Sequence, residues 1–236
     1  METRINKYLS SVGYCSRREA DRLVESGRVS IDGVTAKMGS KVVEGQCVKV
    51  DGKDIQIEEE MILLAFNKPV GIVCTTTDKQ GKDNIVDYIG YNKRIYPIGR
   101  LDKDSNGLIL MTNNGEIMDK ILRSTNGHEK EYIVEVNKDI TDDFVKKMSD
   151  GVYLKELERT TKKCFVKKEG KRTFRIILTQ GLNRQIRRMC ENLGFKVVSL
   201  KRIRIMNICL SDLKEGSYRK VTENEYKKLV SMLENN

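Results

Sequence analysis

The sequence contains a single histidine, His128, no Cys-x-x-Cys pair, and no apolar run longer than the six residues 61–66. Without clustered histidine and cysteine ligands, the common zinc patterns are absent. A bilayer span needs roughly 20 apolar residues, and the opening METRINKYLSS lacks the apolar stretch of a signal peptide. The six cysteines are widely spread along the chain. We therefore expect a cytoplasmic protein whose thiols are reduced.

Metal and cofactor motifs are also missing. Residues 102–107, DKDSNG, match the first half of a calcium loop, with acids at positions 1 and 3. Position 12 of such a loop is a bidentate glutamate, and here it is Asn113, so calcium binding is rejected. There is no dinucleotide fingerprint and no phosphate loop. We therefore predict neither a metal nor a cofactor.

Charge is distributed unevenly over the 236 residues, whose formal net charge is +10. Residues 160–206 hold 14 lysines and arginines against two acids, Glu169 and Glu191. This segment therefore carries a net +12, and the rest of the chain carries −2. A solvated basic face is the simple alternative, but such a concentration favours a polyanionic partner. No amphipathic helix has the apolar aromatic face that membrane binding requires, so we predict nucleic acid and no membrane.

The first 58 residues are predicted to form a compact helix–helix–hairpin unit. Apolar residues recur at helical spacing over residues 5–12 and again over 20–24, and a capping box from Ser16 to Glu19 begins the second helix. Two Asp-Gly pairs further along predict tight hairpin turns. The acidic run at residues 58–60 then predicts a linker.

Arg17 and Arg18 stand in the first turn of that second helix, where the helix dipole disfavours cations by a few tenths of a kcal/mol. Two exposed arginines of no consequence would explain this. Alternatively, the helix N-terminus and both guanidiniums face a phosphate. With Arg4 and Lys7, these side chains are the candidate phosphate contacts of the N-terminal unit.

Residues 61–236 are predicted to form a second, larger domain. Short strands over residues 61–66, 108–112, 132–136 and 174–178 alternate irregularly with a few helices. This order predicts an α+β fold with a mixed, mainly antiparallel sheet.

The run GLNRQIRRM at residues 181–189 places apolar residues on one helical face and Arg184, Arg187 and Arg188 on the other. An exposed Arg187–Glu191 pair worth about 0.3–0.5 kcal/mol would be the purely structural interpretation. Three arginines beside an asparagine and a glutamine instead supply forked phosphate donors together with base-edge hydrogen bonders. The alternation of the following strand predicts that its two arginines, 202 and 204, share one face and extend this basic surface.

Three motifs together carry a family resemblance: GRLDKDSNGL at residues 99–108, HEKEY at 128–132, and GLNRQIRRM at 181–189. They resemble the signatures of pseudouridine synthases of the ribosomal branch, and most closely those of the F-type large-subunit synthases. The N-terminal unit resembles the alpha-L RNA-binding module that precedes many of these enzymes. The resemblance covers nearly the whole chain. It implies isomerisation of uridine to pseudouridine, a reaction that needs no cofactor.

The resemblance also implies roles for individual residues. Asp102 would be the nucleophile, attacking either ribose or base, and Arg187 beside it would keep the carboxylate ionised. Tyr132 would stack on the target uracil, although on its own pattern it would be a core residue of its strand. Arg100 would fill the space that the extruded base leaves. The predicted RNA-binding set is Arg4, Lys7, Arg17, Arg18, Arg100, Lys103, Leu182, Asn183, Arg184, Gln185, Arg188, Arg202 and Arg204.

The expected substrate is structured RNA, most of all large-subunit (23S) ribosomal RNA, and the expected state is a monomer. A transfer-RNA synthase, or an enzyme of dual ribosomal and transfer RNA specificity, would use the same chemistry. A non-catalytic ribosome-associated RNA-binding protein is the remaining alternative. The trio Asp102, Tyr132 and Arg187 argues against it, because a pure binder has no need of a carboxylate inside a cationic groove.

Overall fold

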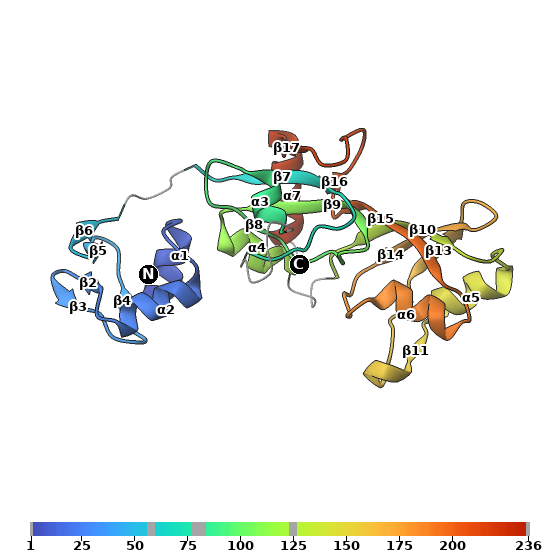
Figure 1. The fold of residues 1–236 in the computed structure, drawn as a ribbon, viewed down its shortest axis with the longest axis horizontal. Coiled ribbons are helices and arrows are strands. Elements are labelled where there is room, and N and C mark those ends of the chain that lie inside the picture. The colour runs from blue at the N-terminus through green and yellow to red at the C-terminus, as the bar shows by residue number, and fades with distance from the viewer. Residues whose placement is uncertain (1, 56–59, 77–83, 123–126, 235–236) are drawn as a thin grey trace. The chain divides into compact units, whose positions relative to one another are not determined.

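The computed structural model describes residues 2–55, 60–76, 84–122 and 127–234. The chain divides into two compact units, and the smaller one comprises Met1–Ile62 with Asn113–Gly115. The larger comprises Leu63–Thr112 with Glu116–Asn236 (Figure 1). Two acids of the predicted linker, Glu58 and Glu59, lie outside the described residues.

The small unit has two helices and two small sheets. Its elements are β1 (Thr3–Arg4), α1 (Ile5–Ser11), α2 (Arg17–Glu25), β2 (Val29–Ile31), β3 (Val34–Thr35), β4 (Lys41–Val42), β5 (Val48–Val50) and β6 (Lys53–Asp54). Strand β1 pairs with β4, and the other four strands pair in the order β3-β2-β5-β6. Ile5, Leu9, Leu23 and Val24 of the helices pack on Val29 and the other buried valines of these strands.

Local sequence determines the turns of this unit. The Asp-Gly pairs at 32–33 and 51–52 adopt positive φ at both residues, between 49° and 82°, as two-residue hairpin turns require. At the start of α2, the backbone N–H of Glu19 donates to the Ser16 hydroxyl at 3.1 Å. The Glu19 carboxylate accepts from Arg22. The predicted Ser16 cap is therefore confirmed, while Glu19 forms a helix ion pair.

The large unit is built on a nine-stranded sheet. Its strands follow the path β13-β14-β10-β15-β9-β7-β17, with β8 paired to β9 and β16 to β15. The strands outside the small unit are β7 (Leu63–Lys68), β8 (Tyr96–Pro97), β9 (Asn106–Thr112), β10 (Lys130–Val136), β11 (Tyr153–Leu154), β12 (Arg159–Thr160), β13 (Phe165–Lys168), β14 (Thr173–Leu178), β15 (Val197–Ile205), β16 (Ile208–Cys209) and β17 (Tyr218–Lys220). Only the β9–β15 pair is parallel among the described strands of this sheet. The predicted α+β fold with a mixed, mainly antiparallel sheet is confirmed.

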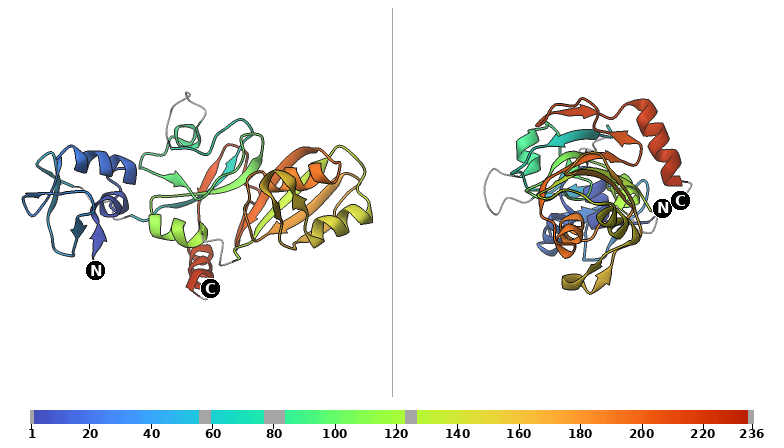
Figure 2. Two further views of the ribbon diagram at one scale, coloured as in Figure 1. Left: turned by 90° about the horizontal axis from the view of Figure 1, so that it is seen from below. Right: turned by 90° about the vertical axis from the view of Figure 1, so that its right-hand side faces the viewer.

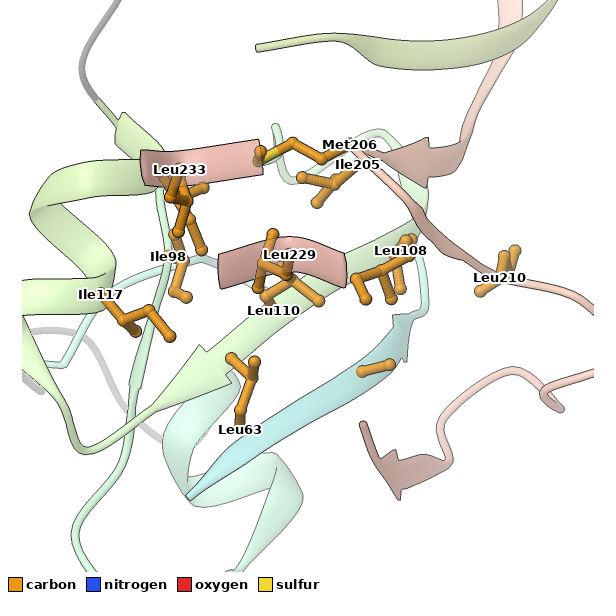
Figure 3. Close-up of a cluster of buried hydrophobic side chains, with 13 residues drawn as sticks. Leu63, Ile98, Leu108, Leu110, Ile117, Ile205, Met206, Leu210, Leu229 and Leu233 are labelled. Atoms are coloured by element: carbon orange, nitrogen blue, oxygen red, sulfur yellow. The ribbon is translucent and has the colours of Figure 1, made fainter. Parts of the chain in front are cut away.

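Helices cover both faces of the sheet. They are α3 (Ile85–Ile89), α4 (Gly115–Leu122), α5 (Asp142–Asp150), α6 (Gln185–Asn192) and α7 (Glu223–Glu234), with a 3-10 turn, η2, at Lys155–Leu157. Helices α4 and α7 lie on one side of β7 and β9, and α3 lies on the other (Figure 2). Leu229 and Leu233 of α7 join Leu63, Leu108 and Leu110 in one buried cluster (Figure 3).

Two further expectations concern membranes and thiols. Within the described ranges, the helices are too short and too polar to traverse a bilayer. All six cysteines are free, as predicted. Burial raises the pKa of Cys164 to about 11 and that of Cys190 to about 12, so both stay protonated near neutral pH.

Candidate active site

Asp102 lies in a braced loop between β8 and β9. The backbone N–H of Ser105 donates to the Asp102 carbonyl at 3.1 Å and closes a turn. Two further bonds join this loop to the segment that follows β7: the Gly71 N–H donates to the Lys103 carbonyl at 2.8 Å, and the Leu101 N–H donates to the Cys74 sulfur at 3.4 Å. These bonds fix the backbone around Asp102, whose side chain stays 34% exposed.

Lys68 holds the neighbouring segment in place. Its ammonium group is completely buried and donates to the carbonyls of Pro69 at 2.8 Å and Ile72 at 2.9 Å. Burial lowers the pKa of Lys68, while Cys74 and Asp102 oppose that effect. Lys68 therefore acts as a structural cross-link behind the Asp102 loop.

A cavity of about 300 Å³ opens beside Asp102, over one face of β10, β14 and β15. Tyr132 of β10 lies on its floor, and Ile186 and Arg187 of α6 line another wall. Asp102 is the only acid among the lining residues that the structure describes. The lysines and arginines that line the cavity are Arg100, Lys130, Arg184, Arg187 and Arg202. The cavity thus combines one carboxylate and one aromatic ring with a strong excess of positive charge.

A bulge in β15 places Arg202 in this cavity. Tyr132 pairs with Arg202, but its neighbour Glu131 pairs with Arg204, so Ile203 is the extra residue. Because consecutive residues of β10 face opposite ways, the bulge puts the two arginines on opposite faces. The predicted common face of Arg202 and Arg204 is therefore wrong.

Both β15 arginines are used internally. Arg202 is 3% exposed, donates to the Leu108 carbonyl at 2.7 Å and lies 6.0 Å from the centre of the Tyr132 ring. Arg204 binds Glu131 at 2.5 Å and Glu129 at 2.9 Å on the other face. Arg202 thus supports Tyr132, and Arg204 neutralises acids of the neighbouring strand, while the phosphate binding predicted for both stays a prediction.

Arg184 forms an ion pair with Asp102, a contact that was predicted for Arg187. Arg184 Nη1 lies 3.6 Å from Asp102 Oδ2. The Arg187 guanidinium is only 8% exposed and donates to the Asp104 carbonyl at 2.8 Å and the Ser105 hydroxyl at 3.0 Å. A buried guanidinium must find such acceptors, which the sequence could not identify. Arg187 still lines the cavity and ties α6 to the Asp102 loop.

Asp104 joins both arginines. Its carboxylate accepts from Nη1 and Nη2 of Arg184, each at 3.1 Å, and lies 3.4 Å from Arg187. Burial alone would raise the pKa of Asp104, but the Arg184 hydrogen bonds and the Arg187 charge lower it below its ordinary value. Arg184 itself has a left-handed backbone, φ 49° and ψ 36°, at the start of α6. Such strain in a non-glycine residue is typical of functional positions.

Other residues of the GLNRQIRRM run have mainly structural contacts. Gln185 is 4% exposed, and its side-chain oxygen accepts from the Leu182 N–H at 3.0 Å. Gln185 also lines the cavity, and its base-reading role stays a prediction. Arg188 donates to the carbonyl and side-chain oxygens of Asn183 and forms an ion pair with Glu156. Asn183 is exposed and Leu182 is half-buried, and both line the cavity.

The remaining predicted RNA contacts are exposed. Arg100 is exposed at the cavity wall, and Lys103 is exposed on the loop beside it. Arg4, Lys7, Arg17 and Arg18 are exposed on the small unit. The structure therefore leaves these six side chains accessible to a polyanion, in contrast to Arg202 and Arg204.

Sequence reasoning missed two residues of the site, Asp104 and Lys130. Asp104 lies two residues after Asp102 in the same short loop. Its partners, Arg184 and Arg187, belong to the basic run at residues 181–189. Lys130 precedes Tyr132 by two on the same strand, and this spacing alone places both on one face. Burial and the nearby Arg202 charge lower the pKa of Lys130.

The arrangement of these side chains defines a class of protein. A carboxylate supported by arginines, beside an aromatic platform in a cationic cavity, suits an enzyme that acts on a nucleotide of a polyanion. Within the ranges that the structure describes, no three His, Cys, Asp or Glu residues are grouped as metal ligands.

Comparisons with known proteins identify the family. Residues 62–192 match the RNA pseudouridylate synthase model, and residues 3–46 match the S4 domain model. The dual-specificity RNA pseudouridine synthase RluF of Salmonella typhi is 54% identical over 234 residues, covering 98% of this chain and 80% of its own length. The ribosomal large subunit pseudouridine synthase B of Bacillus subtilis is 32% identical, covering 97% and 96%. A solved pseudouridylate synthase superposes with a TM-score of 0.72 at 26% identity, covering 96% of this chain and 99% of that one.

The chain belongs to the RNA pseudouridine synthase family and carries an S4 domain at its N-terminal end. The predicted family, the RNA-binding module and the enzymatic class are confirmed. The alternative of a non-catalytic RNA-binding protein is set aside.

Proposed function

We propose that Asp102 is the nucleophile that isomerises uridine to pseudouridine in large-subunit ribosomal RNA. The observation that carries this proposal is the position of the Asp102 carboxylate on the wall of the cavity whose floor is Tyr132. In the reaction, the Asp102 carboxylate adds to the substrate and is released again, so it is regenerated. Between these two steps, the bond from N1 of uracil to C1′ of ribose breaks, the ring turns, and C5 bonds to C1′. The proton leaves C5 and N1 gains one, so the atoms balance without a cofactor.

The other residues of the cavity position the reaction. Arg184 forms an ion pair with Asp102 at 3.6 Å and so orients its carboxylate. Tyr132 provides the surface on which the extruded uracil stacks, and Arg202 supports the ring from beside it. Arg100, exposed at the cavity wall, supports the RNA where the base has left the stack. Arg187 orders the Asp102 loop through Asp104 and Ser105.

Two RNA classes are proposed as substrates. The relative that is 32% identical is named for the large ribosomal subunit, and the relative that is 54% identical is named for dual specificity. We therefore propose ribosomal RNA as the main substrate and transfer RNA as the second. Mapping pseudouridines in both RNA classes from a deletion strain tests this choice, since every lost site is a target.

The proposed assignment of Asp102 is tested by Asp102→Asn. A neutral amide of the same shape cannot attack, so pseudouridine formation should fall to background while fold and RNA affinity persist. Tritium release from RNA labelled at C5 of uracil measures turnover. Asp212→Asn, at an exposed loop position of the same unit, is the matched control. Substantial turnover by Asp102→Asn would remove Asp102 from this role.

The working form is proposed to be a cytoplasmic monomer that needs no metal. Uridine and pseudouridine are isomers at the same oxidation level, so the reaction involves no net oxidation or reduction. Turnover should therefore persist in a chelator, and sedimentation of the active protein should give the mass of one chain, 27.1 kDa.

A further inference from the structure

Lys130 is a cation without a described role. It is half-buried at the start of β10, two residues before Tyr132, and therefore shares the face that forms the cavity floor. Its strand partners on β14 and β15 are Leu178 and Ile205, both buried and apolar, and both lining the same cavity. Among the described residues, no carboxylate is paired with Lys130, whereas Arg204 on the opposite face has two.

An unpaired, partly desolvated ammonium group costs free energy in the unliganded protein. The guanidinium of Arg202 adds repulsion, because it acts on Lys130 as a like charge. Asp102, the one acid among the described residues that line the cavity, is already paired with Arg184. The anion that would compensate Lys130 therefore has to arrive with the substrate.

The position of Lys130 indicates which part of the substrate this is. Exposed cations such as Arg100 and Arg184 suit phosphates, which remain hydrated in a complex. Lys130 lies among apolar side chains on the floor next to Tyr132, the proposed platform of the uracil ring. The polar atoms of that ring are its two carbonyl oxygens and its nitrogens. A uracil ring stacked on Tyr132 would bring these carbonyl oxygens close to an N–H donor at this place.

We propose that Lys130 is a catalytic residue that stabilises the negative charge developing on uracil when the glycosidic bond breaks. The pair of electrons of the N1–C1′ bond stays with the ring and spreads onto the carbonyl oxygens, and the Lys130 ammonium donates a hydrogen bond to one of them. When C5 bonds to C1′, the ring gives this charge up, so Lys130 keeps its proton throughout. This inference rests on the proposed function, because it requires uracil on Tyr132.

The test compares Lys130→Met with the wild type on one RNA that contains a single target uridine. Removing a preorganised donor to developing charge should lower the single-turnover rate about 10²–10³-fold. The RNA Kd and its salt dependence should stay unchanged, because no phosphate contact is lost. Lys130→Arg, which keeps the charge, should recover most of the rate. Lys201→Met is the matched control, because Lys201 is exposed and pairs with Ile133, whose side chain faces the other way.

A second substrate separates charge stabilisation from a structural effect. Fluorine at C5 withdraws electrons and stabilises the ring anion, so Lys130→Met should lose less rate with 5-fluorouridine than with uridine. Consumption of the nucleoside is followed by nuclease digestion and chromatography. An equal loss on both RNAs, a normal rate for Lys130→Met, or a weaker Kd with a flatter salt dependence would each overturn the proposal. An inactive wild type would instead refute the proposed substrate and, with it, this inference.

Folding of the variant provides an independent readout. Methionine fills nearly the same space, and it removes a desolvated charge, so Lys130→Met should unfold at the same temperature as the wild type or higher. A clear loss of stability would indicate a structural lysine and overturn the catalytic role. If Lys130→Met does not fold, Lys130→Gln takes its place on the two RNAs, since loss of the charge predicts a changed rate ratio between them and a merely structural role predicts none.

Discussion

Arg184 donates two hydrogen bonds to the Asp104 carboxylate, from Nη1 and Nη2, each at 3.1 Å. The same Nη1 lies 3.6 Å from Asp102 Oδ2. One guanidinium thus connects two carboxylates of one loop to the first turn of α6. Asp104 competes with Asp102, and with any RNA phosphate, for that guanidinium. The net charge that the loop presents to RNA depends on this competition.

Asp104→Asn is therefore expected to bind RNA more tightly at low salt, by about two- to tenfold, because a charge that repels phosphates is removed. The turnover rate should fall, since Arg184 and Arg187 lose the carboxylate that orients them, but less than in Asp102→Asn. Filter binding and single-turnover rates measure the two effects. Weaker binding by Asp104→Asn would mean that Asp104 presents these arginines to RNA and does not compete for them.

Salt dependence distinguishes exposed arginines from internal ones. Arg17 and Arg18 are exposed on the small unit, so replacing both with alanine should flatten the log K against log salt slope by about 0.7 for each lost phosphate contact. Arg204→Ala should leave the slope unchanged. It should instead lower the free energy of unfolding by about 1–2 kcal/mol, because the buried Glu131 carboxylate then keeps only one of its two arginine partners, Arg175 at 2.6 Å. A flatter slope for Arg204→Ala would restore it to the RNA-binding set.

Gly107 of β9 pairs with Arg202 of the parallel strand β15. Its φ is 104°, and a Cβ there would lie 2.3 Å from the Arg202 carbonyl oxygen. Gly107→Ala should therefore destabilise the protein by about 4 kcal/mol or more and displace Arg202 from Tyr132. Thermal unfolding measures this change. Gly170→Ala is the control, because its nearest neighbour would be at an ordinary 3.6 Å, and a similar loss there would contradict the argument.

The predictable parts of the structure are those that short stretches of sequence determine. The Ser16 cap, the Asp-Gly turns and the apolar face of α6 all depend on residues a few positions apart, and each was predicted. The grouping of Asp102, Tyr132 and Arg187 around one cavity followed from the family motifs, and their catalytic roles are still predictions.

The partners of the arginines were not predictable, because their acids are distant in sequence. Asp104 lies 80 residues before Arg184, and Glu131 lies 73 before Arg204. The net charge of residues 160–206 was therefore predicted correctly. The number of its arginines that are free to contact a polyanion was overestimated, because several are paired with these distant acids. A single bulged residue, Ile203, then reversed the face of Arg204. No alternation pattern reveals where such a residue is inserted.

Deletion of residues 1–58 separates binding from chemistry. The proposed division has an RNA-binding module before residue 58 and a catalytic domain from residue 61. The cut keeps Glu60 and Ile62, whose backbones bind the Asn113 side chain at 2.8 and 2.9 Å, so the contacts next to β9 survive. The core around Leu110 and Leu229 belongs entirely to the larger unit, which should therefore fold alone.

The truncated protein loses Arg4, Lys7, Arg17 and Arg18, and it should bind its RNA more weakly and select its target less well. This loss should raise the apparent KM, while the single-turnover rate at saturating short hairpin stays close to that of the full chain, because the cavity residues are all retained. Circular dichroism establishes that the truncated protein is folded, and rates on one hairpin over a range of enzyme concentrations separate binding from chemistry. A folded truncation that is inactive at saturation would show that the N-terminal module helps to form the active site, contrary to the division proposed.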